Sequence, residues 1–226
     1  MITQRFDASA TPAQWSADTA RQLLARYGIV MRETAIAENV RGGFAAIYPA
    51  LRTMEDAGWI RRGMFVAGMG ASQFATPAAV DLLRTLRREP EPPESIHLAA
   101  SDPANPYGSL LPWRDEGADH SLARASGANV ILVNGRLAAY FQRRNSAIQV
   151  FLPEDEPERT QFARSLAQKL AETAIRHQSR RGGLLISSIN GTAAADHFLA
   201  RFLEESGFTP TSVGFQMRRV AQAALG

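Results

Sequence analysis

The 226-residue sequence contains no cysteine. Disulfides, thiolate metal sites and cysteine nucleophiles are therefore excluded, and a reducing intracellular compartment fits this composition. The start of the chain lacks a basic, apolar leader, and no run approaches the roughly 18 apolar residues of a membrane span. With 45% hydrophobic residues, the chain can still bury a core. We expect a globular, cytoplasmic protein with no membrane partner.

Lysine is nearly absent, because 24 of the 25 basic residues are arginine. The net charge is only +3, so the distribution of charge says more than its total. Residues 1–88 hold 11 arginines against 7 acids, residues 89–120 hold 1 against 7, and residues 121–226 hold 13 basic against 8 acidic residues. Two mildly basic blocks thus flank an acidic connector. This balance is compatible with nucleic-acid binding and also with an ordinary solvated surface.

The common catalytic signatures are also missing. The four histidines show no metal-ligand spacing, so no metal site is predicted. They are His97, His120, His177 and His197. No Gly-x-Ser-x-Gly elbow is present. Asp119, His120 and Ser121 are adjacent in sequence, which turns their side chains apart rather than together.

Helical signals dominate the first block. Ser16 is predicted to cap a first amphipathic helix, which Gly28 ends. A second helix is expected over residues 33–40 and a third up to Ala57. Pro49 is tolerated in the third helix if its first turn starts near residues 45–47, where amides have no partner. A strand over residues 59–66, with a basic bend that contains glycine, completes the outline of a winged helix.

The domain boundary is predicted at the acidic, proline-rich segment EPEPPE, residues 89–94. Before it, Thr76 and Pro77 open one more helix, which runs to Arg88. We expect a winged-helix domain over residues 1–88, a linker and the DPANPYG connector over 89–127, and an α+β module over 128–226.

The last of these regions mixes strand and helix signals. Asn134-Gly135 is a strong hairpin signal between two apolar runs. The predicted strands cover residues 129–133, 137–142, 147–152, 184–189 and 212–217, and the predicted helices cover 157–177 and 194–206. The fold class is therefore α+β: an N-terminal winged helix followed by a small module with an antiparallel sheet and two helices.

Several segments, in order, resemble one known family. They are RYGIVMRE, GGFAAIYPALRTMEDAG, RRGMFVAG, ASQFATPAAVDLLR, SDPANPYGSLLPW, NVILVNGRLAAYF and SGFTPTSVGFQMR. These segments are similar to the C-terminal end of large helicase-related (Lhr) superfamily-2 ATP-dependent DNA helicases, and DPANPYG is the most distinctive. The resemblance implies a DNA-binding accessory segment of a DNA-repair helicase, with DNA and the parent protein's motor domains as partners.

The motor itself is not expected here. The chain has no Gly-x-x-x-x-Gly-Lys-Ser/Thr loop and no Asp-Glu-x-His motif, so ATP hydrolysis cannot be assigned to it. ATP and magnesium are expected only in the absent motor domains, and no cofactor is expected in this segment.

The resemblance also raises an enzymatic alternative. The C-terminal region of these helicases is similar to bacterial winged-helix DNA glycosylases, whose Gln-x-Gln or Gln-x-Asp motif is absent here. The candidate catalytic carboxylate is Asp102, with Tyr107 or Trp113 to stack on a flipped base. The local account is that Asp102 and Asn105, each before a proline, form turns by bonding nearby amides.

The DNA-contact candidates lie in the winged helix. They are Arg41, Gly42 and Gly43 at the start of the third helix, Tyr48 and Arg52 on its outer face, and Arg61 and Arg62 in the wing. Free amides at a helix N-terminus suit phosphate, and arginine forks suit phosphate oxygens or guanine edges. We expect mainly phosphate contacts with little base readout. The alternative is that the winged helix serves as a protein-protein module.

Other basic clusters have a simpler explanation. Positive charge at the end of a helix complements the helix dipole. This explanation covers Arg176, His177, Arg180 and Arg181 with Gly182 and Gly183, and also Arg84, Arg87 and Arg88. A further alternative involves no DNA: an exposed apolar surface of the α+β half would mediate self-association into a homo-oligomer.

Overall fold

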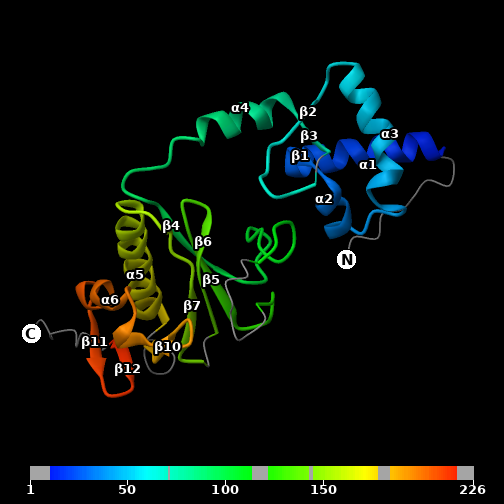
Figure 1. The fold of residues 1–226 in the computed structure, drawn as a ribbon. Coiled ribbons are helices and arrows are strands. Elements are labelled where there is room, and N and C mark those ends of the chain that lie inside the picture. Colours follow the sequence, from blue (N-terminus) through cyan, green and yellow to red (C-terminus); the bar gives the residue numbers. More distant parts are fainter. Residues whose placement is uncertain (1–10, 71, 114–121, 143–144, 178–183, 218–226) are drawn as a thin grey trace, which may run out of the picture. The chain divides into compact units, whose positions relative to one another are not determined.

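The structure is a computed structural model that describes residues 11–70, 72–113, 122–142, 145–177 and 184–217. The chain folds into two compact units, Met1–Arg88 and Glu89–Gly226. The first is mainly helical, and in the second a long helix covers a larger sheet (Figure 1). The two units have separate hydrophobic cores.

The first unit is a winged helix. Its elements are α1 (Pro12–Tyr27), β1 (Ile29–Val30), α2 (Arg32–Ala37), α3 (Gly43–Asp56), β2 (Arg61–Gly63), β3 (Gln73–Ala75) and α4 (Pro77–Thr85). The strands pair antiparallel in the order β1-β3-β2. Phe74 of β3 is fully buried and packs with Ile47 and Leu51 of α3 in one core. The predicted winged-helix fold is confirmed.

The helix α1 begins earlier than predicted. Its N-cap is Thr11, whose hydroxyl accepts from the Gln14 amide while the Gln14 side chain accepts from the Thr11 amide. Pro12 at the first helical position favours this start, since no partner is lost there. Ser16, the predicted cap, lies inside the helix and donates to the Ala46 carbonyl at 2.8 Å. It joins α1 to α3 instead of capping the start of a helix.

The helix α3 also begins earlier than predicted. Gly42 adopts a left-handed conformation (φ 75°) and the helix starts at Gly43, so Pro49 stands in the second turn rather than the first. A proline there leaves the Ala45 carbonyl without its helical donor. Pro49 and Ala45 are both exposed, so water can take the place of the missing bond.

The wing is a hairpin whose second strand the sequence did not reveal. Of the predicted strand over residues 59–66, only Arg61–Gly63 pairs, with Arg62 opposite Phe74 of β3. The unpredicted strand β3 lies directly before the cap of α4. That cap is confirmed, because the Thr76 hydroxyl accepts from the Ala79 amide at 3.2 Å. The helix α4 ends at Thr85 rather than Arg88.

The second unit is built on a six-stranded sheet. Its strands, in spatial order, are β10 (Thr192–Ala193), β9 (Ser188–Ile189), β7 (Ala147–Val150), β6 (Arg136–Gln142), β5 (Ala128–Val133) and β4 (Ser95–Ala99). A smaller sheet contains β11 (Phe208–Thr211), β12 (Gly214–Met217) and β8 (Leu185–Ile186). The helices are α5 (Glu158–His177) and α6 (Ala200–Glu205), with a 3₁₀ turn, η1 (Ala194–Asp196), before α6. The predicted α+β class is confirmed.

Part of the region expected to be a linker belongs to this sheet. The strand β4 pairs antiparallel with β5 along its whole length, from Ser95 opposite Val133 to Ala99 opposite Asn129. The predicted strand over residues 184–189 is broken at Ser187, whose amide donates to the Ser146 carbonyl. At this residue the chain leaves the small sheet, which contains β8, and enters the large sheet, which contains β9. Its second half, β9, pairs parallel with β7, so the large sheet is not wholly antiparallel.

The predicted helix over residues 194–206 is also divided. The chain forms the turn η1 first and enters α6 only at Ala200. Between them the Leu199 amide donates to Nδ1 of His197 at 3.1 Å, which supplies a partner outside the helical pattern. The predicted last strand, residues 212–217, is one arm of the hairpin of β11 and β12.

The central strands of the large sheet, β5 and β6, are buried on both faces. Side chains alternate along β5, so that Ile131 and Val133 lie in the core beneath α5 while Val130 and Leu132 lie in the core on the opposite face. A bulge in β6 leaves Ala138 unpaired opposite β5. Such an extra residue shifts the alternation of the strand. Because α5 covers only one face of the sheet, another segment must cover the face that carries Val130 and Leu132.

That cover includes the DPANPYG segment, which was expected to be a connector. The rings of Tyr107 and Trp113 stack with centroids 6.5 Å apart, and Trp113 meets Tyr140 of β6 edge-on at 5.6 Å. The Tyr107 hydroxyl accepts from the Leu137 amide at 3.1 Å. Gly108 (φ 75°) lies so close to Trp113 that a Cβ there would stand 2.4 Å from the indole ring.

We predict that Gly108→Ala destabilises the second unit by about 3 kcal/mol, because the methyl group meets the indole and the left-handed backbone disfavours a side chain. Urea unfolding of the whole chain measures the loss. The matched control is Gly135→Ala, where φ is 76° but no atom lies within 4 Å of the new Cβ. This control should lose only about 1 kcal/mol. Equal losses in the two variants would contradict the close contact with Trp113.

Candidate nucleic-acid interface

The helix α3 stands in the position of a recognition helix, but its outward positions carry little positive charge. Ala45, Pro49 and Thr53 are exposed, and the Thr53 hydroxyl donates to the Pro49 carbonyl at 3.1 Å. Asp56 adds a negative charge at the end of the helix. Direct base readout uses arginine, asparagine or glutamine at such positions, and these four residues include none. Positive charge lies instead beside the helix and in the wing.

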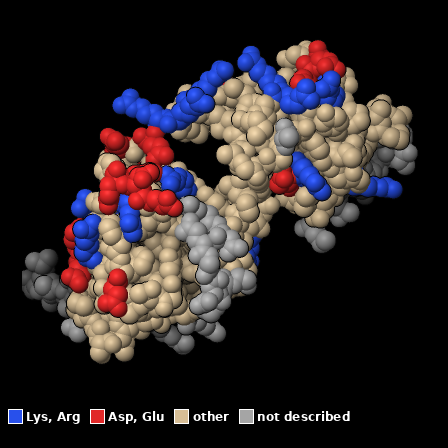
Figure 2. Space-filling view, viewed as in Figure 1, with Lys and Arg blue, Asp and Glu red and all other residues tan. Residues whose placement is uncertain are grey.

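Arg52 and Arg62 lie on α3 and in the wing as expected, but both are already paired with a carboxylate. Glu55 joins them, with Oε2 3.6 Å from Nη1 of Arg52 and Oε1 3.2 Å from Nε of Arg62. Asp56 lies 4.0 Å from Arg52. Acidic and basic side chains accordingly lie side by side where α3 ends (Figure 2). Glu55 was not among the predicted contact residues, although its spacing of three from Arg52 on a helix was a signal for this ion pair.

The side chain of Glu55 is only 22% exposed. A partly buried carboxylate is screened less by solvent, so it acts strongly on the two guanidinium groups next to it. The pairing therefore lowers the positive potential that Arg52 and Arg62 present to a phosphate.

Arg41 and Arg61 form no ion pair within the parts of the chain that the structure describes. Arg41 precedes α3, Arg61 lies on β2 opposite Ala75, and both are exposed. The Gly43 amide was expected to be free for a phosphate. It instead donates to the Val40 carbonyl at 2.8 Å. Of the four candidate arginines, these two have the most freedom to contact DNA.

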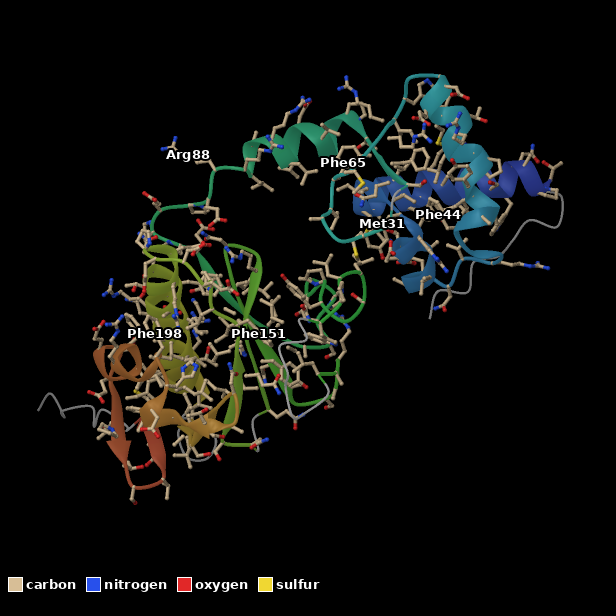
Figure 3. All side chains as sticks on the ribbon, in the orientation of Figure 1. Met31, Phe44, Phe65, Arg88, Phe151 and Phe198 are labelled. Atoms are coloured by element: carbon tan, nitrogen blue, oxygen red, sulfur yellow. The ribbon has the colours of Figure 1, made fainter. Side chains whose placement is uncertain are left out.

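Tyr48 packs inward rather than on an open outer face. Its ring meets Phe74 edge-on at 5.9 Å and lies 5.8 Å from Phe44, which is labelled in Figure 3. The residue is half-buried and packs against the core of the winged helix. Its ring cannot stack on a base while it fills this place.

Gln73 holds the wing in place and was not anticipated from the sequence. Its side chain is fully buried, and Oε1 accepts from the amides of Phe65 and Val66 at 2.8 Å each. Nε2 donates to the carbonyls of Val66 at 2.9 Å and Gly70 at 3.2 Å. A single amide group thus satisfies four backbone groups of the loop between β2 and β3. No local sequence pattern marks this role.

A groove of about 570 Å³ lies between α1 and α3. Its lining is mostly small and apolar and consists of Pro12, Ala13, Ser16, Ala17, Arg21, Ala46, Pro49, Ala50, Thr53, Met54, Ala57 and Trp59. Trp59 is 63% exposed. The only charged residue of the lining, Arg21, is paired with Asp18 at 2.7 Å. The chemistry of this groove suits an apolar surface better than a phosphate backbone.

A family model described as the winged-helix domain of large helicase-related protein matches residues 9–95. These residues are an Lhr winged-helix domain. The match covers α1 to α4 and the wing with its Gln73 contacts, and it ends at Ser95, the first residue of β4.

Two relatives extend the similarity beyond the Lhr winged helix. The chain is 38% identical over 198 residues to the "Lhr helicase/ probable uracil glycosylase" of Mycolicibacterium smegmatis, which covers 83% of this chain and 13% of that protein. It is 33% identical over 198 residues to the "Lhr helicase/uracil glycosylase" of Escherichia coli, which covers 86% of this chain and 12% of that protein. The chain is therefore homologous to a C-terminal part of such Lhr proteins and spans about an eighth of their length.

In this Lhr-type chain, Asp102 takes part in a turn, as the local account predicted. Its Oδ1 accepts from the Ala104 amide at 2.8 Å, and Oδ1 of Asn105 accepts from the Tyr107 amide at 3.1 Å. Arg124 donates to the carbonyl of Asp102 at 3.0 Å and to that of Asn105 at 2.7 Å. The carboxylate of Asp102 is half-buried and keeps Oδ2 outside these contacts. Catalysis by Asp102 therefore has no positioned partner among the described residues.

The remaining basic clusters lie at the ends of α4 and α5 or outside the described residues. Arg84 is paired with Asp81 at 2.9 Å. Arg176 is exposed near the end of α5. Arg180, Arg181, Gly182 and Gly183 lie outside the described residues, as do Asp119, His120 and Ser121.

No group of three or more histidine, aspartate or glutamate side chains gathers as a metal site within the part of the chain that the structure describes. None of the described helices is both long and apolar enough to cross a membrane.

We predict that Gln73→Leu loosens the wing of the Lhr winged helix, at a cost of about 2–4 kcal/mol, because leucine leaves buried backbone donors and acceptors without partners. Hydrogen exchange at the Phe65 and Val66 amides is the direct measurement. Exchange at these two amides should rise more than exchange at Phe74 in the same variant. An unchanged rate at both would show that Gln73 does not hold the loop.

Proposed function

We propose that this Lhr-type segment is a DNA-binding accessory module whose winged helix contacts the phosphate backbone and reads few bases. The observation that carries the proposal is a contrast within the interface. Arg41 and Arg61 are exposed and have no ion pair with any described residue, while the outward positions of α3 are small, neutral or acidic. Phosphate contacts position a protein on DNA without selecting sequence. Arginine without a carboxylate partner is suited to such contacts.

The proposal extends to the parent protein. The chain has no ATP-binding loop, so motor domains elsewhere in the parent protein would supply ATP hydrolysis, with magnesium, and this segment would hold or orient DNA beside them during repair. Support comes from the words helicase and uracil glycosylase in the names of the two relatives. A module that binds mainly phosphate suits this role, because it tolerates any sequence that the motor presents.

Within this proposal, Glu55 limits the affinity of the interface. It neutralises Arg52 and Arg62, which would otherwise join Arg41 and Arg61 as phosphate contacts. Removing the carboxylate should therefore strengthen binding. If the winged helix were a protein-protein module, removal of the Glu55 carboxylate or a change in salt would not alter its DNA affinity in this way.

We expect Arg41→Ala/Arg61→Ala to weaken duplex binding about tenfold or more at low salt, and to reduce the slope of log K against log salt by about 2. Fluorescence anisotropy over a salt series measures both quantities. Arg21→Ala on α1, where the side chain is paired with Asp18, is the matched control and should change neither.

Glu55→Gln is expected to act in the opposite direction, with an affinity gain of roughly threefold. The two changes together separate the proposal from its rival. If neither variant alters binding, or if the chain self-associates without any DNA affinity in light scattering, the proposal fails and the assembly role is supported.

Base excision is a second candidate function. The term "uracil glycosylase" in the names of the two bacterial relatives favours it. Asp102 is the carboxylate to test, because its Oδ2 is outside the turn contacts. We expect Asp102→Asn to abolish any uracil release from single-stranded DNA by this chain while leaving its stability unchanged, since asparagine can still accept from the Ala104 amide. A gel assay of abasic-site cleavage measures the release. Release that persists in the variant would exclude Asp102.

A further inference from the structure

Arginine and phenylalanine side chains gather on the second unit where α5 and α6 lie side by side. The Cζ atom of Arg159 lies 4.1 Å from the centroid of the Phe198 ring, and that of Arg201 lies 4.8 Å from the same centroid. Arg201 also lies 4.5 Å from the centroid of Phe202. Phe198 is labelled in Figure 3. Stacking on a ring fixes the plane of a guanidinium group and leaves its N–H edges free to donate.

Neither Arg159 nor Arg201 forms an ion pair within the described parts of the chain. The nearest candidates on α5 and α6 are engaged elsewhere, because Glu158 pairs with Arg136 and Glu205 lies 3.5 Å from Arg164. The carboxylate of Glu156 accepts from the amide and hydroxyl of Thr160. The other acids of the surrounding segments are exposed, and these are Glu154, Asp155, Asp196 and Glu204.

One N–H donor of Arg159 has no hydrogen-bond partner. Its Nε is buried from solvent and has no hydrogen-bond partner. A buried charged donor without a partner costs free energy, so an anion that reached it would be bound favourably.

His197, the residue before Phe198, adds a donor close enough to Arg159 to be affected by its charge. Its Nδ1 accepts from the Leu199 amide at 3.1 Å, so the neutral ring carries its proton on Nε2. Burial, and then the charge of Arg159, lower the pKa of His197 below its ordinary value. The ring is therefore neutral at pH 7 and can donate from Nε2.

We propose that Arg159, Arg201 and His197 form a binding site for a phosphate group, either in an ester or as the free ion. Guanidinium forks match phosphate oxygens, and one phosphate lies roughly 4 Å from each Cζ in a forked pair. The two Cζ atoms are at most about 9 Å apart, because each lies within 5 Å of the Phe198 centroid. One phosphate can contact both where they stand within about 8 Å of each other, which is twice the distance from a phosphate to each Cζ. The site lies in the second unit and does not rest on the function proposed for the winged helix.

The test is an NMR titration of the histidine ring signals in the whole chain. Sodium phosphate is compared with sodium chloride at equal ionic strength. Bound phosphate places negative charge beside His197, so the pKa of this ring should rise by several tenths of a unit or more while that of His97 stays constant. No selective shift of His197 in phosphate would overturn the proposal.

Variants separate a specific site from general attraction. Arg159→Ala/Arg201→Ala should remove the phosphate response of His197. Arg164→Ala is the matched control, since Arg164 also stacks on Phe202, at 5.6 Å, but is paired with Glu205. Arg159→Lys/Arg201→Lys should keep the charge and lose most of the affinity, because an ammonium group cannot donate as a fork. A response that survives the double alanine variant would refute the site.

Two further probes identify the source of the phosphate. If a short single-stranded oligonucleotide shifts His197 at tenfold lower concentration than inorganic phosphate, the site takes the nucleic-acid backbone. If only inorganic phosphate or a nucleoside monophosphate shifts it, the site takes a small phosphate compound. The titration is repeated in Arg41→Ala/Arg61→Ala. An unchanged response there keeps this result independent of duplex binding by the winged helix.

Discussion

Side-chain amides hold the loops of both units, and the conformations of the wing loop and the DPANPYG segment depend on them. A backbone group removed from water needs a partner, and neither the wing loop nor the DPANPYG segment has a neighbouring strand to supply one throughout. Gln73 supplies it in the wing, and the fully buried Asn105 does so after β4, where its Nδ2 donates to the Ala100 carbonyl at 2.9 Å. Asn190, although exposed, does the same at the end of β9, where its side chain bonds both the amide and the carbonyl of Val150 at 2.8 Å. Each amide acts as donor and acceptor at once, which an apolar residue cannot replace.

The arginines of this chain act in physically different ways that composition does not distinguish. Arg52 and Arg62 are neutralised by Glu55, and Arg124 donates to backbone carbonyls of the DPANPYG segment. Arg159 and Arg201 stack on Phe198 and form no ion pair with any described residue. Only arginines without a partner among the described residues can act on an anion at full strength. The net charge of +3 therefore says little about where a phosphate would bind.

The Lhr winged helix shows how one fold can serve different contacts. A winged helix presents α3 and a wing, but the side chains on them decide whether bases, phosphates or protein are bound. Here the outward positions of α3 are small or acidic, and the groove toward α1 is lined by apolar residues. The arginines lie at the edges of this surface. The arrangement favours attachment to a backbone over recognition of a sequence.

Local signals in the sequence determined the helices, the hairpin and the family. Thr76 caps α4, and Asn134 and Gly135 turn the chain with positive φ (47° and 76°), because capping and turn chemistry act within a few residues. Tertiary structure decided what distant residues do together. The pairing of β4 with β5, the inward packing of Tyr48 and the position of Glu55 beside Arg62 follow from the close approach of separate segments. A periodicity of apolar residues carries no information about such approaches, since it records only which face of each element is buried.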